Sequence, residues 1–362
     1  MKKILKFILT VFLIFILSIN SHSIETTEEI WDNIDNTTKE YLNDLDIDEV
    51  TFEEIFDLTP TRVIEFIIDL AFNKTESVLS RFVLIFIVLI INAISSSFLN
   101  VNTELNKVID SISMLIIASY LMSSLSRTIT DAVVGIQSSN IFINSYLPIM
   151  VGLIVASKNP ALAVTYNSYT VFLSNIISLV TDKFIMPIIS IIFSFNIISS
   201  FSGEEYQLKI TKILRKLVII VTSLFSTIFT GLLSAQGILA ISSDNLALKG
   251  IKFVSGAFIP VVGGNISEVI SSAISSFVLM KSTLGVFIII VIILINLPVM
   301  IELLIWYLFL YLCSVFSSLL KLDNITSTLE SLSSTISLLN IIVFFITFIL
   351  VVTTGVIIIM GK

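Results

Sequence analysis

Residues 286–316 read "VFIIIVIILINLPVMIELLIWYLFLYLCSVF", and this apolar stretch decides the fold class. A helix needs about 20 mostly apolar residues to cross a bilayer, and this run is longer than that. Glu302 is its only acid, and it contains no lysine, arginine or histidine. The stretch therefore predicts a membrane helix that carries one carboxylate at an apolar depth.

Similar apolar runs recur on both sides of this stretch. Before it they fall at 82–99, 108–126, 141–157, 161–181, 184–201 and 217–241, and after it a last helix is expected at 337–360. The 362 residues are 56% hydrophobic and 13% charged, with a mean hydropathy of +1.04. This composition excludes an ordinary soluble domain. The expected fold class is all-α, a polytopic helical membrane protein.

The first 23 residues, "MKKILKFILTVFLIFILSINSHS", have the order of a secretory signal peptide. Three lysines precede a short apolar core, and small residues follow it at cleavage spacing. An uncleaved first membrane helix is the alternative. In both cases residue 24 emerges outside the cytoplasm.

Residues 24–80 form an acidic segment, with 16 acids against three bases. Apolar residues recur in it at helical spacing, in the sets Ile47, Val50, Ile55, Leu58 and Val63, Phe66, Ile67, Leu70. Thr59 before Pro60 is typical of a helix start. We expect two or three short amphipathic helices that lie on the membrane domain or on a partner. A weakly ordered acidic linker is the alternative for residues 24–45.

The multi-pass membrane domain is expected over residues 81–362. Five crossings between 82 and 201 that start outside would end inside. The next loop, "GEEYQLKITKILRKL", carries the densest basic cluster of the chain, Lys209, Lys212, Arg215 and Lys216. The positive-inside rule assigns such a loop to the cytoplasm, which makes it a candidate cytosolic docking loop. "KLDNITSTLESLSS", residues 321–334, is expected as an interhelical loop or a surface helix.

Two pairs of prolines suggest an internal repeat. Pro148 and Pro260 lie 112 residues apart in similar surroundings, and Pro187 and Pro298 lie 111 apart. The related halves would be 82–201 and 210–320, and after five crossings the second half would be inverted, as in many transporters. Chance matches between apolar segments are the alternative.

The stretch "GAFIPVVGGNISEVISSA", residues 256–273, predicts a broken helix. Pro260 removes a backbone donor, and Gly263 and Gly264 weaken helix propagation. Unpaired backbone groups cannot face lipid, so the break should be sheltered by protein or line a wet cavity. Glu268, beside Ser267, would be hydrated there or paired with Lys281. The motif also includes Gly256 and Phe258.

Polar residues inside the apolar runs have two interpretations. Glu302, preceded by Asn296 and Pro298, could belong to a proton, ion or substrate path, or it could be a hydrogen-bonded residue that packs helices together. Gln236 in "LLSAQGILA" has the same two interpretations.

Nothing in the sequence indicates catalysis. The chain has one cysteine, Cys313, in an apolar run, and one histidine, His22, in the predicted signal peptide. It has no Ser-His-Asp set, phosphate-binding loop, nucleotide fingerprint or zinc motif. We expect no enzymatic activity, disulfide, cofactor, metal or nucleic-acid partner, and a lipid bilayer as the surroundings.

The run from Leu233 to Gly285 resembles the stage III sporulation protein AE family of endospore-forming bacteria. The matching residues are Gln236, Gly237, Lys252, Phe253, Gly256, Phe258, Ile259, Pro260, Val261, Val262, Gly263, Ser267, Glu268, Lys281 and Gly285. The resemblance extends to the leader, the acidic segment, "LPIMVGLIVAS" at 147–157 and the Pro187 helix.

This resemblance implies a component of the eight-protein stage III A assembly in the mother-cell membrane around the forespore. Its partners would be the assembly's ATPase and ring-forming members and, indirectly, stage II sporulation protein Q. The assembly resembles a channel or secretion apparatus that the engulfed forespore needs. A permease for a small solute and a membrane assembly scaffold are the alternatives.

Overall fold

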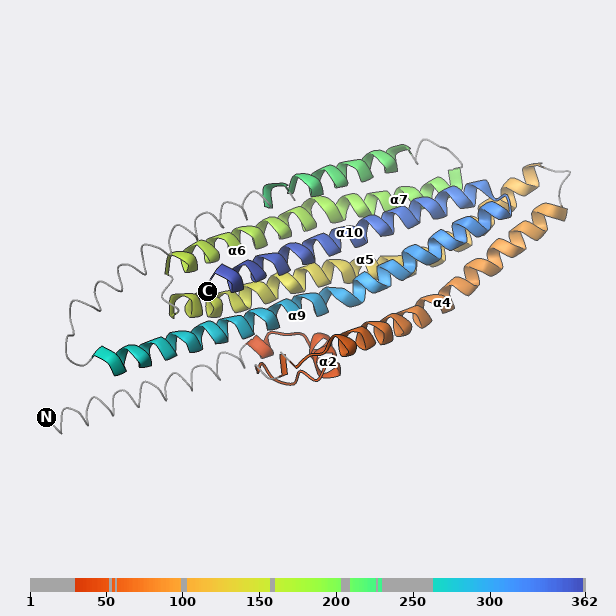
Figure 1. Ribbon diagram of the computed structural model, residues 1–362. Coiled ribbons are helices and arrows are strands. Elements are labelled where there is room, and N and C mark those ends of the chain that lie inside the picture. Colours follow the sequence, from red (N-terminus) through yellow and green to blue (C-terminus); the bar gives the residue numbers. More distant parts are fainter. Residues whose placement is uncertain are drawn as a thin grey trace.

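The computed structural model describes residues 30–51, 54–55, 57–98, 103–156, 160–202, 209–225, 227–229 and 263–360. These residues form long helices that lie side by side in one elongated bundle, with a small helical segment against its flank (Figure 1). No β-strand occurs among them. The expected all-α class is confirmed. Among the described residues, five helices are long and apolar enough to cross a membrane: Pro60–Ser95, Val108–Ala156, Pro160–Asn196, Thr283–Leu319 and Asp323–Gly355.

Four of the described helices are much longer than the ~20 residues that a bilayer requires, and the others are shorter elements. The long ones are α4 (Pro60–Phe98), α5 (Thr103–Ala156), α9 (Gly263–Leu319) and α10 (Asp323–Met360), and the shorter ones are α2 (Asn36–Asp44), α6 (Pro160–Val180), a π-helical turn η1 (Thr181–Ile185) and α7 (Met186–Ser202). At 1.5 Å per residue, the 54 residues of α5 span about 81 Å. The hydrocarbon core of a bilayer is about 30 Å thick, so α5 and α9 extend well beyond one such layer.

Two of the expected loops are helical, so the prediction of separate crossings is wrong there. The runs 108–126 and 141–157 are parts of α5, and the runs 161–181 and 184–201 are parts of one helical rod, α6–η1–α7. Residues 127–140, between two of the expected crossings, include several polar side chains. They are accommodated inside the bundle because neighbouring helices supply hydrogen-bond partners, as described below.

The π-helical turn η1 explains how the helical rod α6–η1–α7 continues past Pro187 without a break. Pro187 has no backbone N–H, and its ring would clash with the carbonyl four residues earlier in a regular α-helix. That carbonyl belongs to Lys183, which lies within η1. A π-turn widens the helix locally, so the chain passes Asp182 and Pro187 without leaving the rod.

The acidic segment is folded against the bundle rather than forming a linker over its described part. Asp35 caps α2 by accepting hydrogen bonds from the Thr38 N–H at 3.0 Å and the Thr38 hydroxyl at 2.7 Å. Leu42 and Ile47 are fully buried. The ring of Trp31 stacks on Phe287 of α9 with centroids 6.1 Å apart.

The predicted helix start at Thr59 and Pro60 is confirmed. α4 begins at Pro60, and the Thr59 hydroxyl accepts a hydrogen bond from the Arg62 N–H at 3.4 Å. The helix then continues without interruption from the acidic segment into the first apolar run, so these two predicted units share one rod. The expected apolar stripes are buried at Ile47, Ile55, Phe66 and Leu70 and half-buried at Val50, Leu58 and Val63, whereas Ile67 is exposed, so its place in the second stripe is wrong.

α9 is the central helix, since it packs against α10, α5 and α4. Phe82 of α4 lies between Trp306 and Phe309 of α9, at centroid distances of 5.1 and 4.7 Å. α9 and α10 are joined by a tight turn at Lys321, whose φ of 59° is left-handed. The last helix therefore begins at Asp323, earlier than the expected 337.

Candidate functional site: a polar network in the middle of the bundle

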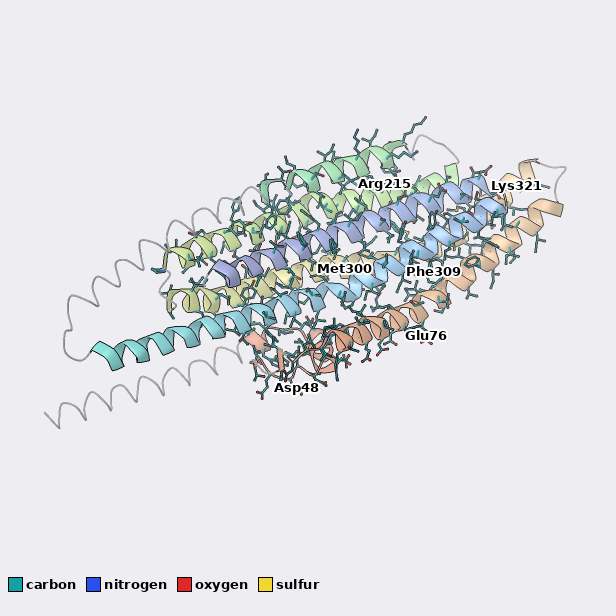
Figure 2. The ribbon with its side chains drawn as sticks, in the orientation of Figure 1. Asp48, Glu76, Arg215, Met300, Phe309 and Lys321 are labelled. Atoms are coloured by element: carbon teal, nitrogen blue, oxygen red, sulfur yellow. The ribbon has the colours of Figure 1, made fainter. Side chains whose placement is uncertain are left out.

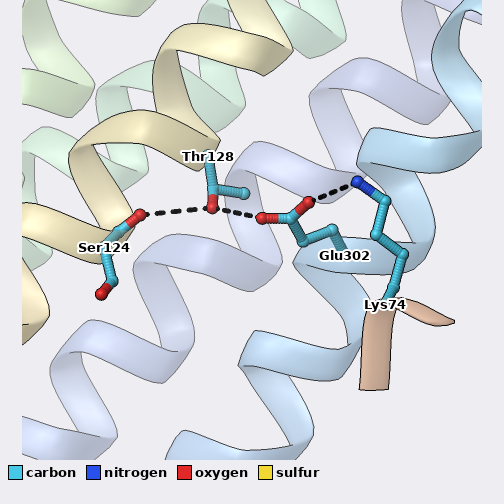
Figure 3. A network of polar contacts seen from close by, with 4 residues as sticks. All are labelled: Lys74, Ser124, Thr128 and Glu302. Atoms are coloured by element: carbon cyan, nitrogen blue, oxygen red, sulfur yellow. Dashed lines mark hydrogen bonds and ion pairs between the residues drawn. The ribbon is translucent and has the colours of Figure 1, made fainter. Parts of the chain in front are cut away.

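The carboxylate of Glu302 joins three helices in the middle of the bundle. Its Oε2 accepts a hydrogen bond from Nζ of Lys74 on α4 at 2.9 Å, and its Oε1 accepts one from the hydroxyl of Thr128 on α5 at 2.7 Å (Figure 3). The Thr128 hydroxyl also lies 3.4 Å from the carbonyl of Ser124. It has one proton to donate, and the shorter distance assigns that proton to the carboxylate.

The pair is only partly shielded from solvent. The side chain of Glu302 is 15% exposed, and that of Lys74 is 31% exposed. A carboxylate in apolar surroundings is expensive unless a charge and hydrogen bonds compensate it. Here a cation compensates the charge, and each oxygen accepts a hydrogen bond. The arrangement favours the structural interpretation of Glu302, a residue that links helices.

Lys74 was missed by sequence reasoning, although the sequence contains a signal for it. It occupies the four-residue register of the buried stripe of α4, between Leu70 and Val78. A charged residue at a core position of an amphipathic helix requires a buried partner. The partner could not be named, because Glu302 lies 228 residues away in the chain.

Asn296 makes a second link between α9 and α5. Its side-chain amide donates to the hydroxyl of Ser139 at 2.7 Å and to the carbonyl of Ile292 at 3.0 Å. Close approach of the helices depends on Gly135, where an added Cβ would lie 3.2 Å from Asn296 Oδ1. The predicted intramembrane polar residue Asn296 is therefore buried as a helix-linking amide.

Two further polar residues of α5, Gln137 and Asn140, hold the rod α6–η1. Asn140 donates to the carbonyl of Ser174 at 3.2 Å and to the hydroxyl of Ser178 at 2.7 Å. Gln137 donates to a carboxylate oxygen of Asp182 in η1 at 3.2 Å. These contacts explain why the polar run 127–140 does not end the helix.

The predicted basic loop is a helix over residues 209–225, so the expectation of a loop is wrong there. Lys209, Lys212 and Lys216 are exposed at spacings of three and four, which place them on one helix face. Arg215 instead turns toward α10 and donates to the hydroxyl of Ser331. Figure 2 shows Arg215 and Lys321 on the opposite side of the bundle from Asp48.

The predicted broken-helix motif lies only partly in the described chain. Gln236, Gly256, Phe258 and Pro260 lie outside the described residues. The other residues of the motif belong to α9: Gly263, Gly264, Ser267, Glu268 and Lys281. The side chains of residues 263–282 lie outside the described part of the structure. The structure thus brings Glu302 together with Lys74 and Thr128, and it does not test the pairing of Glu268 with Lys281.

Within the described ranges, no group of three or more His, Cys, Asp or Glu residues could hold a metal ion. Cys313 is fully buried in α9. Outside the membrane-spanning helices, burial raises the pKa of the Tyr41 hydroxyl, and the nearby Lys74 ammonium opposes that rise. Tyr41 therefore stays neutral beside the network.

The fold and the network define a class: a multi-helix membrane protein whose long helices are linked by a few charged and amide contacts. The chain belongs to the stage III sporulation protein AE family, because the sequence model of that family matches residues 37–361. A curated relative, "Stage III sporulation protein AE" of Bacillus subtilis (strain 168), is 28% identical over 184 residues, which cover 51% of this chain and 46% of the relative. The match thus spans about half the length of the relative. No solved structure matches.

Proposed function

We propose that this protein is a membrane component of the stage III A sporulation complex, in the mother-cell membrane around the forespore. The observation that carries this proposal is the match to the family over residues 37–361. The complex would form the channel or secretion apparatus on which forespore development after engulfment depends. Its cargo is not part of the proposal.

Two surfaces of the bundle support a place between partners. The acidic segment presents Asp32, Asp44, Asp48 and Glu49 outward, and we propose that it contacts ring-forming members between the two membranes. Stage II sporulation protein Q would then be reached indirectly.

The exposed lysines of helix 209–225 suit the cytosolic side by the positive-inside rule. Three helical rods, α4, α5 and α6–η1–α7, precede this helix. Three crossings that start outside end inside, as five would, so the proposed side is unchanged by the correction of the topology. This face would dock the ATPase of the assembly.

Within the complex, we propose that the protein acts as a scaffold rather than as a solute permease. The supporting observation is that both oxygens of Glu302 are hydrogen-bonded, one of them to Lys74. A carboxylate that passes protons or ions must exchange its partners, whereas this one holds α4 and α5 to α9. The signal peptide, the inverted repeat and the broken helix at Pro260 stay predictions.

Deletion of the gene in the spore-forming host tests the proposed function. We expect engulfed forespores that shrink and fail to start their late transcription programme, as seen by microscopy with a late forespore reporter. Complementation with the intact gene is the control. Normal numbers of heat-resistant spores from the deletion strain would overturn the proposal.

A further inference from the structure

One exposed face of α5 is polar in the middle of a helix that is otherwise apolar enough to cross a membrane. A shallow depression of about 720 Å³ follows this face. It is lined by Ser119, Met122, Ser123, Ser126, Arg127, Thr130 and Asp131. At 100° per residue these positions fall on one side of the helix, over a length of about 18 Å. We name this set the α5 polar face.

Apolar residues continue the same side of α5 above and below the α5 polar face. Ile112 and Ile116 are 52% and 46% exposed on one side of it, and Val134 and Ile141 are 50% and 65% exposed on the other. Lipid chains can cover such apolar residues, but they cannot solvate an arginine and an aspartate. The α5 polar face therefore needs a covering that the lipid does not supply.

The two charges on this face, Arg127 and Asp131, form no ion pair with a described residue of any other helix. Arg127 and Asp131 lie one helical turn apart, and neither makes an ion pair or a side-chain hydrogen bond with a described residue. Thr128, the next residue after Arg127, points the other way and binds Glu302. At this level of α5, the inward polar side chain therefore has a hydrogen-bond partner, whereas the outward charges form no ion pair with another helix.

We propose that a second copy of this protein covers the α5 polar face, with two α5 helices packed side by side about a two-fold axis. Such an interface uses the same patch of both subunits. Arg127 of each copy would then pair with Asp131 of the other, as charges one turn apart do in parallel coiled coils.

The charge pattern selects this occupant. In two parallel copies equal levels of α5 face each other, and each Arg127 reaches one turn along the axis to Asp131 of the other copy, so both charges can find a partner in a second copy of the same chain. Ser119, Ser123 and Ser126 are small enough to let two helices approach closely, and their hydroxyls can bond across the interface. A partner of different sequence would have to supply the opposite charge pattern separately.

A charge-exchange experiment tests this proposal. Two differently tagged copies are co-expressed, extracted in mild detergent and co-purified. We expect Arg127→Asp in both copies to reduce co-purification at least tenfold, because each interface then holds only acids. Asp131→Arg in both copies should do the same, since each interface then holds only bases. Mixing one copy of each variant should restore co-purification, because acids then face bases.

Controls separate the interface from folding and from general charge effects. Glu76→Arg reverses an exposed charge on α4 and should leave co-purification unchanged. Each single variant should elute as a monodisperse monomer, which shows that it is folded. In a Cys313→Ser background, Ser123→Cys should form a disulfide-linked dimer in membranes, and Ile91→Cys on the outer side of α4 should not.

Three results would overturn the proposal. The first is a wild-type protein that is monomeric both in detergent and in lipid nanodiscs. The second is equal co-purification of all variants. The third is a mixture of the two charge variants that associates no better than either alone, which would assign the face to a different subunit or to water.

Discussion

Two pairs of opposite charge lie at nearly the same level of the bundle, but only one of them forms an ion pair within the described chain. Lys74 and Glu302 come from α4 and α9 and meet at 2.9 Å between the helices. Arg127 and Asp131 both lie on α5 and point outward without an ion pair among the described residues. Thr128 connects the two pairs, because it bonds Glu302 and directly follows Arg127.

The difference distinguishes charges that are paired within one copy of the protein from charges that depend on another molecule for a partner. An inward charge must find its partner within the fold, or the helix would not pack there. An outward charge at an apolar depth can be satisfied by another molecule. The first pair is therefore expected to determine the stability of one copy, and the second is expected to determine association.

The largest effect on stability is expected from Lys74→Met. It leaves the Glu302 carboxylate, which is 15% exposed, with the Thr128 hydroxyl as its one remaining partner. The loss should be about 2–3 kcal/mol, measured as the unfolding free energy in detergent. Lys321→Met removes an exposed lysine at a turn and should change stability by less than about 0.5 kcal/mol. Equal losses in the two variants would mean that the pair contributes nothing.

A smaller effect is expected from Glu302→Gln. The amide can still accept from Lys74 or Thr128, but the Lys74 ammonium, only 31% exposed, loses its counter-charge. The expected loss is about 1–2 kcal/mol. Together with Lys74→Met, this variant completes a double-mutant cycle. A coupling energy near zero would show that the two side chains do not interact in the membrane-bound protein.

A third variant, Asn296→Leu, tests whether amide links are worth less than the ion pair. It removes the 2.7 Å hydrogen bond to Ser139 and keeps a side chain of similar volume. Hydrogen bonds between membrane helices average about 0.6 kcal/mol, so we expect a loss of about 1 kcal/mol or less. A loss larger than that of Lys74→Met would reverse the ranking of the inward contacts.

The smallest effect on the stability of a single copy is expected from Asp131→Asn. The carboxylate makes no ion pair within the described chain, so the monomer should change by less than about 0.5 kcal/mol. Measurement at dilutions where the protein is monomeric isolates this quantity. A loss above about 1 kcal/mol would show that Asp131 has a partner inside its own chain, which would end the contrast between the two pairs.

Much of the fold could be predicted because apolar length is a local property. The apolar run at 286–316 lies within one helix, and the Thr59 and Pro60 start is a local capping signal. The false breaks at 127–140 and 182–183 have one cause. Polar residues interrupt the apolar runs at both places, and Gln137 of α5 donates to Asp182 of η1 across the helix interface, a contact between residues 45 positions apart that the apolar runs do not indicate.

Of the ion pair at the candidate site, one residue could be predicted from the sequence and the other could not. Glu302 stands out because no other acid or base lies in its run. Its partner Lys74 could not be identified, since it lies 228 residues away in the chain, in the acidic segment, whose helices were expected to lie on the membrane domain or on a partner without a defined contact. The α5 polar face was also missed, because its serines fell in the expected crossing 108–126 whereas Arg127, Thr130 and Asp131 fell between that crossing and the next.

The central claim is that Glu302 holds α4 to α9 rather than passing protons or ions. The yield of heat-resistant spores tests it most directly, compared among strains that carry wild type, Glu302→Gln, and Glu302→Gln combined with Lys74→Met, with protein levels checked by immunoblot. Neutralising both partners removes the unpaired ammonium, so a structural link predicts that the double variant recovers most of the yield lost in Glu302→Gln. A double variant that sporulates no better than Glu302→Gln, at equal protein level, would contradict the claim and assign the carboxylate a chemical role.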